Sequence, residues 1–431
     1  MHAPGPNAAR RSLAKEEAAV RVCVVGGGVI GLCTAYYLRA RGADVTLVER
    51  DRCGQATSRG NGGWITPSLS GPIAGPGVIL QSLKWMLDPS SPFYIRPRLD
   101  PKLAAWCVRF ARNCTSARYR EGMRVMLEFG ERTHELYADL ERDGLAFEHE
   151  RTGLLFVAQS EAGLAEFDRE FAVMESLGHD PALRRLSGAE LLELEPSLDP
   201  SVGFGMLAQR EAWVRPESLC GALAERLRSS GVEVREQTAI DRLDRDRGGW
   251  RVRAGGETID CDRLVIAAGV WSLPLLERLG QRIPLQPAKG YSITAHGSGT
   301  APRHALYFAE SKVGVTPFAG GVRLSGTLEL TGMDDSRDRR RMEAIADGTV
   351  RYLRDWRPER RELEWAGLRP YLPDALPAIG PVPGATGAFV ATGHGMSGMT
   401  LGPATGSAVA QMVLDDVVPR TLLPFQLGRR Y

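Results

Sequence analysis

Three glycines near the start of the chain constrain its fold more than any other feature. Gly26, Gly28 and Gly31 form the pattern G-x-G-x-x-G, directly after the apolar run 21–25 and directly before a helical pattern. The first glycine permits a tight turn, the second lets the backbone approach a pyrophosphate, and the third allows close packing of helix on strand. The alternating segment 44–49 then completes a βαβ unit that ends in a carboxylate. This order of elements predicts a dinucleotide-binding domain.

Residues around this turn are expected to bind the two halves of the dinucleotide. Val29 and Ile30 lie in the turn, just before a helix expected over 32–41, whose free N-terminal N–H groups attract phosphate. Glu49 follows about 20 residues after the last glycine, where a carboxylate accepts hydrogen bonds from ribose hydroxyls. Arg50 comes next in the chain. The pattern does not by itself decide between NAD and FAD.

Composition argues against several other classes of protein. With 54 Lys and Arg against 52 Asp and Glu, the net charge of +2 gives no electrostatic reason for binding nucleic acid. No apolar run reaches the roughly 18 residues of a transmembrane helix. The seven cysteines are scattered without a C-x-x-C pair, so neither a disulfide framework nor a metal site is expected. These features favour the cytoplasm, with peripheral attachment at the inner face of a membrane as an alternative.

The chain is expected to have an α/β fold with a split domain, a second domain and an N-terminal arm. Mixed strand and helix patterns assign the split, Rossmann-like domain to 21–75, 201–280 and 361–425. The stretch 76–200 is mainly helical, with one long amphipathic helix over 123–140, and is expected to be inserted into the second domain. Residues 281–360 alternate as an antiparallel sheet does and end in a charged helix. Residues 1–20 are expected to be a flexible arm.

Four segments are similar to those of a known family. They are the glycine turn, ATSRGNGGWITPS (56–68), PGVILQSLKWMLDPSSPFYIRPRLDPKLAAW (76–106), and WAGLRPYLPDALPAIGP with ATGHGMSGMTLGPATG (365–406). With them the chain resembles the D-amino-acid dehydrogenase small-subunit family, within the broader group of glycine-oxidase and D-amino-acid-oxidase-like flavoproteins. The likeness extends over nearly all of the chain from residue 21. It implies FAD rather than NAD, a split Rossmann-like FAD-binding domain, and an α+β substrate domain whose antiparallel sheet covers the flavin.

The resemblance also implies candidate site residues. Arg369 matches the arginine that binds the substrate carboxylate in related oxidases, and a guanidinium suits this task because its fork is bidentate and always charged. Tyr291 and Lys289, in a K-G-Y segment that the family shares, and His394 are further candidates. Tyr307 and Tyr371 are secondary candidates for the same pocket. No protein nucleophile is expected, because hydride transfer from Cα of a neutral amine to flavin N5 requires only orientation and desolvation.

Three further loops are expected to contact FAD. They supply Ser58, Asn61, Gly62 and Gly63, then Ala268 and Gly269, and finally Gly395, Met396, Ser397 and Gly398. The last group precedes a helix whose N-terminus would place positive dipole near the flavin N1–C2=O edge. Trp64 follows the glycines near the ring, where covalent attachment would require His or Cys. FAD is therefore expected to bind non-covalently.

The expected reaction is oxidative deamination of a small amino acid, taken to be a D-amino acid, with electrons passed to a quinone or another carrier. The alternative is an oxidase that uses O2 and acts on glycine, sarcosine, a cyclic imino acid or a specialised biosynthetic amino acid. A second alternative is an FAD-binding electron-relay subunit. Arg369 disfavours this last reading, because a relay has no need of a carboxylate site. The sequence leaves the oligomeric state open.

Overall fold

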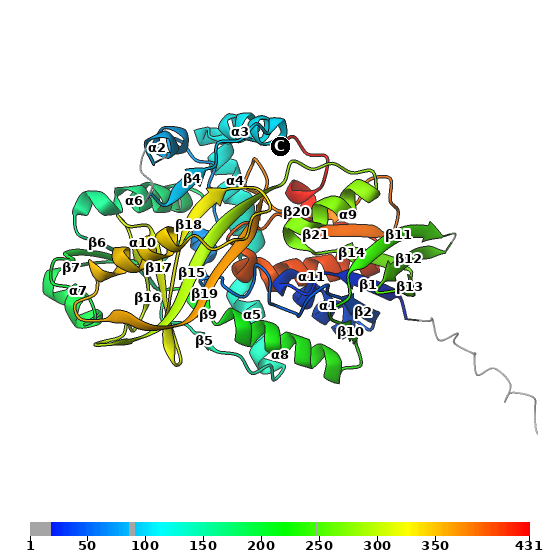
Figure 1. Cartoon of the computed structure of the whole chain (residues 1–431), viewed down its shortest axis with the longest axis horizontal. Helices are drawn as coiled ribbons and strands as arrows, with labels where there is room; N and C mark the ends of the chain where they lie inside the picture. The colour runs from blue at the N-terminus through cyan, green and yellow to red at the C-terminus, as the bar shows by residue number, and fades with distance from the viewer. Residues whose placement is uncertain (1–18, 86–90, 247) are drawn as a thin grey trace, which may run out of the picture.

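Two large sheets organise the computed structural model, which describes residues 19–85, 91–246 and 248–431. In Figure 1 a six-stranded sheet lies on the right and a nine-stranded sheet on the left. Residues 1–18, which make up most of the expected arm, lie outside the described ranges. The expected fold class, α/β with two unlike sheets, is confirmed.

The six-stranded sheet is parallel except at one edge, where β20 pairs antiparallel with β21. Its strands run in the order β10 (Glu233–Arg235), β2 (Asp44–Val48), β1 (Arg21–Val25), β14 (Arg263–Ile266), β21 (Ala388–Thr392), β20 (Ala378–Pro381). The sequence of β1, RVCVV, is buried at its last four positions, as expected of a central parallel strand covered on both faces. Strands from three distant parts of the chain therefore build one sheet.

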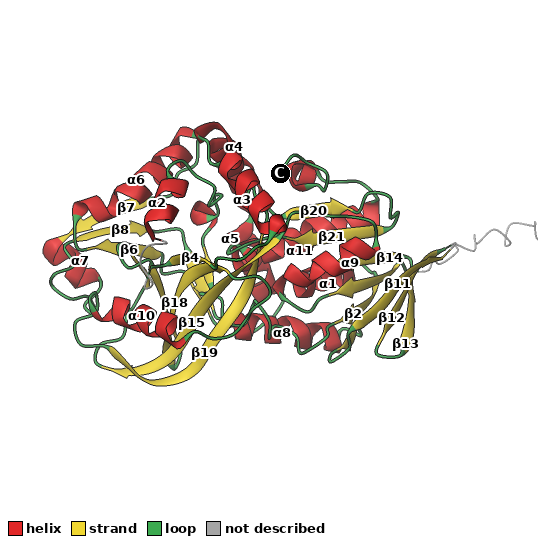
Figure 2. Cartoon of the chain, turned by 45° about the horizontal axis from the view of Figure 1, so that its top comes forward, coloured by secondary structure: helices red, strands yellow, loops and turns green. Residues whose placement is uncertain are grey.

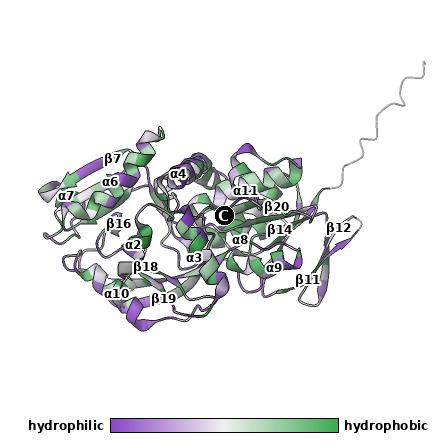
Figure 3. Ribbon diagram, turned by 90° about the horizontal axis from the view of Figure 1, so that it is seen from above, coloured by the Kyte–Doolittle hydropathy of each residue, from purple (hydrophilic) through white to green (hydrophobic). Residues whose placement is uncertain are grey.

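Three helices form the core on one face of this sheet. They are α1 (Val29–Ala40), α8 (Pro216–Ser229) and α11 (Gly398–Asp415). A Cβ at Gly406 would lie 2.7 Å from the carbonyl oxygen of Cys33, so the glycine lets α11 approach α1 at backbone distance. Figure 3 shows hydrophobic residues gathered around β14 and β20 and hydrophilic ones on the outer strand β12 (Gly249–Ala254).

The other face of the sheet is covered by a small antiparallel sheet and a short helix. The small sheet has the order β11 (Ile240–Asp246), β12, β13 (Glu257–Cys261), and the helix is α9 (Ser272–Arg278). Their buried apolar residues join those of β1 and β14 in a second core cluster. Both faces of the six-stranded sheet are thus covered by apolar side chains of other elements.

The nine-stranded sheet is mainly antiparallel and includes parts of the chain far apart in sequence. Its order is β19 (Arg357–Tyr371), β15 (Gln286–Ser298), β18 (Gly321–Leu330), β17 (Val313–Phe318), β16 (Ala305–Phe308), β6 (Leu154–Ala158), β8 (Phe204–Ala208), β7 (Leu183–Ser187), with β4 (Phe93–Ile95) paired to β18. Helix α10 (Arg339–Val350) lies beside β18 and β15 (Figure 2). The stretch 76–200 therefore supplies strands as well as helices to this sheet.

The helices of that stretch differ from expectation at one point. The prediction of one long helix over 123–140 is wrong: α4 (Ser116–Gly130) ends at Gly130 and α5 (Thr133–Arg142) begins at Thr133. Just after the break α5 bonds to α11, where Thr133 donates to the carbonyl of Thr400 at 3.2 Å and the hydroxyl of Tyr137 to that of Met399 at 2.8 Å. The other helices here are α2 (Val78–Trp85), α3 (Pro101–Asn113), α6 (Glu161–Ser176) and α7 (Gly188–Leu194). Within the described ranges, none of the helices has both the length and the apolar character to span a bilayer.

Candidate active site

An elongated cavity runs along the carboxyl ends of β1, β2, β14 and β21. Predicted cofactor residues that line it are Gly26, Gly28, Val29, Ile30, Glu49, Arg50, Ser58, Asn61, Ala268, Gly269, Gly395 and Gly398. The carboxyl edge of a parallel sheet is where ligands bind in such folds. Five predicted residues, Gly31, Gly62, Gly63, Met396 and Ser397, lie beside this lining rather than in it.

The glycine turn at the start of α1 is shaped by close approach of the backbone. Gly26 has φ +112°, and a Cβ there would lie 2.5 Å from the carbonyl oxygen of Ala267 on the neighbouring strand. A Cβ at Gly31 would overlap the carbonyl of Gly26. Gly28 caps α1 without a side-chain bond, and Val29 N–H donates to Ser58 Oγ at 3.1 Å. The free N–H groups of this first turn form a site for an anionic group, and a diphosphate fits it.

The carboxylate of Glu49 lies at the other end of the turn. Its Oε2 accepts from the N–H of Gly27 at 2.6 Å and its Oε1 from the N–H of Asp51 at 3.0 Å. Each carboxylate oxygen retains a further lone pair, which leaves the group able to accept from ribose hydroxyls. The two backbone bonds hold the side chain in place before any ligand arrives.

Residues that sequence reasoning missed close this end of the cavity. The guanidinium of Arg50 lies 4.0 Å from the ring centroid of Trp271. Trp271 lines the cavity together with Thr238, Ala239, Ile240, Pro274, Leu275 and Arg278. The flat, partly apolar surface fits an adenine ring. Only the nearness of Trp271 to the predicted Gly269 was available as a signal, because the remaining residues belong to no motif.

The opposite end of the cavity meets the N-terminus of α11. Gly395 has φ +53°, its N–H donates to the carbonyl of Pro370 at 3.0 Å, and Gly398 and Met399 line the cavity. The first N–H groups of α11 give this end a positive dipole. The side chain of Met396, by contrast, is 49% exposed and points away from the interior.

His394 lines the same end and is neutral. Its side chain is buried, Nε2 lies 3.0 Å from Thr405 Oγ1, and burial lowers the pKa of the imidazole to about 3. A neutral ring in this position donates or accepts one hydrogen bond without placing charge beside the cofactor site. Its location agrees with the predicted site role, while the role itself stays a prediction.

Arg369 lies on β19 and its guanidinium rests on Gly290 of the paired strand β15. A Cβ at residue 290 would overlap the guanidinium atoms, so a glycine there allows the guanidinium to keep this position. Nη1 donates to the carbonyl of Thr327 at 2.8 Å, and no carboxylate of the described residues pairs with the group. Burial lowers the pKa of this guanidinium, which nonetheless stays charged because arginine ionises so strongly. A buried cation with one neutral acceptor is able to bind an anionic group, and this role of Arg369 stays a prediction.

The acceptor of that bond comes from an irregular point in β18. Between Gly326 and Glu329, β18 has one residue more than β15 has opposite, which is a β-bulge. Thr327 lies in the bulge with φ +67°, a left-handed conformation that β-branched residues rarely adopt. Bulges re-aim groups near functional sites, and this one points a backbone carbonyl at Arg369.

Tyr371 lies two residues beyond Arg369 on β19, and side chains two apart on a strand share a face. Its ring packs on Gly395 and, with Leu103 and Trp106 of α3, forms an apolar cluster. The hydroxyl is buried and has no hydrogen-bond partner among the described residues. Burial raises the pKa of Tyr371 to about 12, so it remains a donor.

Lys289 and Tyr291 flank Gly290 and therefore point to the opposite face of β15. There the Tyr291 hydroxyl donates to Glu329 Oε2 at 2.9 Å, and Lys289 Nζ donates to Ser336 O at 3.0 Å and lies 3.6 Å from the same carboxylate. Arg341 completes this buried network at 2.8 Å from Glu329. Burial raises the pKa of the tyrosine. Arg369 thus lies on the opposite face of the sheet from these two predicted residues, on the face where Tyr371 packs against the cavity-lining Gly395. None of the three predicted residues itself lines the cavity.

The loop from residue 56 to 63 passes along the cavity. Ala56, Thr57, Ser58 and Asn61 line it. Gly63 N–H donates to Asn61 Oδ1 at 2.8 Å, and Trp64 turns away so that its indole N–H donates to Thr316 at 3.0 Å. Cys53 packs beside Gly27, near the ribose end. Burial raises the pKa of this thiol, which makes it a poor nucleophile.

Comparison with known proteins adds the family. The family described as FAD dependent oxidoreductase matches residues 21–412. The chain is 33% identical over 408 residues to a D-amino acid dehydrogenase of Bradyrhizobium diazoefficiens, covering 91% of this chain and 95% of the relative. It is 32% identical to a D-amino acid dehydrogenase of Methylobacterium radiotolerans over 91% of this chain and 96% of that one.

Solved structures of similar fold are more distant in sequence. Glycine oxidase from Geobacillus kaustophilus superimposes with a TM-score of 0.73 at 22% identity, over 95% of this chain and 99% of that chain. L-Proline dehydrogenase from P. horikoshii superimposes with a TM-score of 0.70 at 18% identity, over 93% and 95% of the two chains. At this identity the likeness concerns the fold.

Proposed function

The chain belongs to the family of FAD-dependent oxidoreductases, and from this membership we propose that it oxidises a small amino acid, of the D-configuration, at Cα. The observation that supports the substrate class is Arg369, a partly buried guanidinium without a carboxylate partner among the described residues. A substrate carboxylate supplies the missing charge. The relatives named D-amino acid dehydrogenase support the configuration.

The proposed cofactor position follows the cavity. The N-terminus of α1 and Ser58 would hold the diphosphate, Glu49 the adenosine ribose, and Arg50 with Trp271 the adenine. Pro370, His394 and the start of α11 would hold the ring end. FAD, when bound, would accept one hydride, which carries both electrons of the oxidation. We propose non-covalent binding, since the nearest cysteine, Cys53, packs at the ribose end.

The protein's part in the reaction is to bind and orient the substrate. Arg369 binds the carboxylate through the edge of the guanidinium that Thr327 leaves free. The Tyr371 hydroxyl is a second donor to the same carboxylate, since no other acceptor satisfies it. Leu103 and Trp106 exclude water beside it. Because His394 is neutral, it adds no positive charge at this end of the cavity. This arrangement lowers the barrier by orientation and desolvation.

We propose that a quinone or another carrier, rather than O2, receives the electrons. The support is the 33% sequence identity to a D-amino acid dehydrogenase, in an alignment that covers 91% of this chain. An oxidase acting on glycine, sarcosine or a cyclic imino acid is the second candidate. Its support is the similarity in fold to a glycine oxidase.

The test is anaerobic reduction of the purified holoenzyme, followed by flavin absorbance. D-Alanine, D-proline, their L-enantiomers, glycine and sarcosine are mixed in turn, and air is then readmitted. Rapid bleaching by the D-enantiomers with slow recovery in air supports the proposal. Bleaching by glycine or sarcosine with fast recovery supports the oxidase instead. If the enzyme contains FAD and no amino acid bleaches it, the carboxylate role of Arg369 is refuted.

A further inference from the structure

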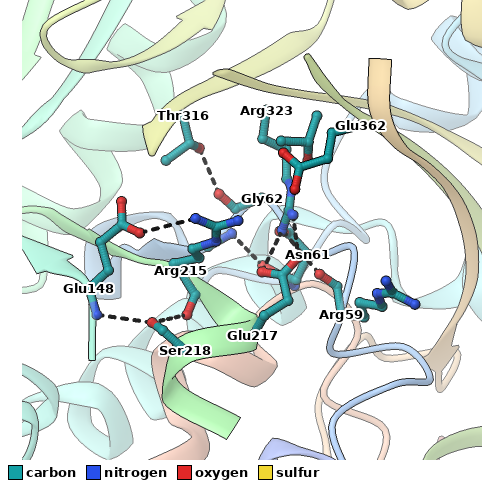
Figure 4. Close-up of polar contacts among 12 residues, drawn as sticks. Arg59, Asn61, Gly62, Glu148, Arg215, Glu217, Ser218, Thr316, Arg323 and Glu362 are labelled. Carbon is teal, nitrogen blue, oxygen red and sulfur yellow. Dashed lines mark hydrogen bonds and ion pairs between the residues drawn. The ribbon is translucent and has the colours of Figure 1, made fainter. Parts of the chain in front are cut away.

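Arg323 is a buried arginine that belongs to no recognised motif and that the proposed chemistry does not use. Only 1% of its side chain is exposed. It lies on β18 and points toward the loop that contains Arg59 and Asn61 (Figure 4). A buried cation is costly unless it is both ion-paired and hydrogen-bonded. Its partners therefore indicate what the charge is for.

The guanidinium joins three separate parts of the chain. Nε donates to Thr294 Oγ1 on β15 at 2.9 Å, and Nη1 donates to the carbonyls of Arg59 and Asn61, each at 3.0 Å. Both terminal nitrogens also donate to the carboxylate of Glu217, in the first turn of α8. One side chain thus links the nine-stranded sheet, the loop 56–63 and helix α8, which packs on the six-stranded sheet (Figure 4).

These contacts fix the direction of the loop's peptide groups. The carbonyls of Arg59 and Asn61 point at Arg323, and that of Gly62 accepts from Thr316 Oγ1 at 2.6 Å. The peptide bonds of the described chain are trans, so each N–H points opposite to the carbonyl before it. The N–H groups of Gly60 and Gly62 therefore point away from Arg323.

Those two N–H groups have no acceptor among the described residues. The N–H groups that alternate with them, those of Arg59, Asn61 and Gly63, each donate to an acceptor within the loop. Ser58 and Asn61, on either side of Gly60, line the cofactor cavity. Gly60 also packs under the indole of Trp365, and Gly62 lies against Ser325, so both are confined by the nine-stranded sheet. Two free donors in a rigid loop at the cavity suit a ligand with hydrogen-bond acceptors.

We propose that Arg323 is a positioning residue for the cofactor: it turns the loop carbonyls toward the sheet and thereby presents the N–H groups of Gly60 and Gly62 to FAD. This inference rests on the cofactor site of the proposed function. The loop meets β19 next to the ring end, because Gly60 packs on Trp365 and the Thr57 hydroxyl donates to the carbonyl of Leu368 at 2.9 Å, two residues before Pro370. Donors fixed there would stabilise the electron-rich reduced cofactor more than the oxidised one. Arg323 should therefore raise the midpoint potential of bound FAD as well as its affinity.

The experiment compares Arg323→Met and Arg323→Lys with Glu217→Gln, which retains the shape of the pair without its charge. The dissociation constant of oxidised FAD is measured by fluorescence titration of the deflavinated protein, and the midpoint potential by dye equilibration of the holoenzyme. Arg323→Met should weaken FAD binding at least tenfold and lower the potential. A tenfold larger loss of affinity for reduced than for oxidised FAD corresponds to about 30 mV. Arg323→Lys and Glu217→Gln should lie between wild type and Arg323→Met.

The matched control is Arg341→Met. Arg341 is equally buried and ion-paired, with Glu329, and donates to the carbonyl of Ser91, but it does not touch the loop. The proposal predicts a potential close to wild type for this variant, whatever its thermal stability. Equal shifts in the Arg323 and Arg341 variants, or an unchanged potential in Arg323→Met and Arg323→Lys, would overturn it. A wild-type protein that binds no FAD would overturn the proposed function as well, which separates the two failures.

Discussion

Replacing Arg369 with methionine removes the charge while keeping an unbranched side chain over Gly290. In the free protein the guanidinium has one neutral acceptor, Thr327 O, and no carboxylate partner among the residues described. Its burial is therefore a cost to the free protein that substrate binding offsets. The variant should bind substrate poorly and yet be no less stable than wild type.

The magnitude follows from what the substrate carboxylate would lose. Leaving one member of a buried ion pair without its partner costs about 3–5 kcal/mol. Because about 1.4 kcal/mol is a factor of ten, this predicts a fall in kcat/KM of roughly 10²- to 10⁴-fold. Ethylamine is alanine without its carboxylate, and its turnover should be nearly the same in the two proteins. The variant therefore loses the preference for the amino acid over the amine.

The assay measures kcat/KM for D-alanine and ethylamine with an artificial electron acceptor, together with the melting temperature and FAD content. Equal FAD content shows that the cofactor site is intact. The reasoning is refuted if Arg369→Met reduces both substrates equally. It is also refuted if the melting temperature falls while kcat/KM for D-alanine is unchanged, since Arg369 would then be a structural group.

Three further outcomes are expected. Gly290→Ala should displace the Arg369 guanidinium and lower kcat/KM for the amino acid by roughly 10²-fold without loss of FAD, because a small misplacement of a positioned group costs that much. Steady-state kinetics with FAD quantitation test this. An unchanged kcat/KM contradicts it. Thr327→Gly should relieve the left-handed strain and raise the free energy of unfolding by up to about 2 kcal/mol with KM unchanged, which denaturant titration and kinetics measure; a fall in stability would contradict it. The pKa of His394 lies near 3 in the folded protein, below its value in the unfolded chain. Below pH 6.5 the imidazole is therefore protonated in the unfolded chain but not in the folded one. The free energy of unfolding should then fall by about 1.4 kcal/mol for each pH unit. His394→Asn should flatten this dependence in melting curves between pH 7 and 4.5, and an identical acid dependence would rule out the histidine as its source.

Local sequence was sufficient for the turn at Gly26, because that turn depends on residues within one short segment. The role of Arg369 was taken from the family resemblance and stays a prediction. Local sequence was insufficient for Lys289 and Tyr291. Alternation along a strand predicts that these two share a face, but which face meets the cavity depends on the pairing of β15 with β19 and β18. The K-G-Y resemblance marked the right strand, and its central glycine is the residue that contacts Arg369.

The break between α4 and α5 and the network of Arg323 were unpredictable for a related reason. The apolar spacing over 123–140 continues through the break, and the hydrogen bonds that hold the second helix go to α11, some 260 residues away. Arg323 stands in the strand sequence GVRLSG with no partner nearby in the chain, since Arg59 and Glu217 lie 264 and 106 residues away. Interactions of such long range leave no periodic pattern.

The six-stranded sheet has a consequence for how the protein is made. Its strands come from residues 21 to 392, and the α11 cap of the cavity from residues after that. During synthesis, the first βαβ unit leaves the ribosome long before β14 and β21 can cover its edge. Such a late-closing sheet folds slowly, and its open strand edges favour aggregation. FAD added to nascent chains would find no complete pocket, so the cofactor can act as a folding ligand only after nearly the whole chain has been translated.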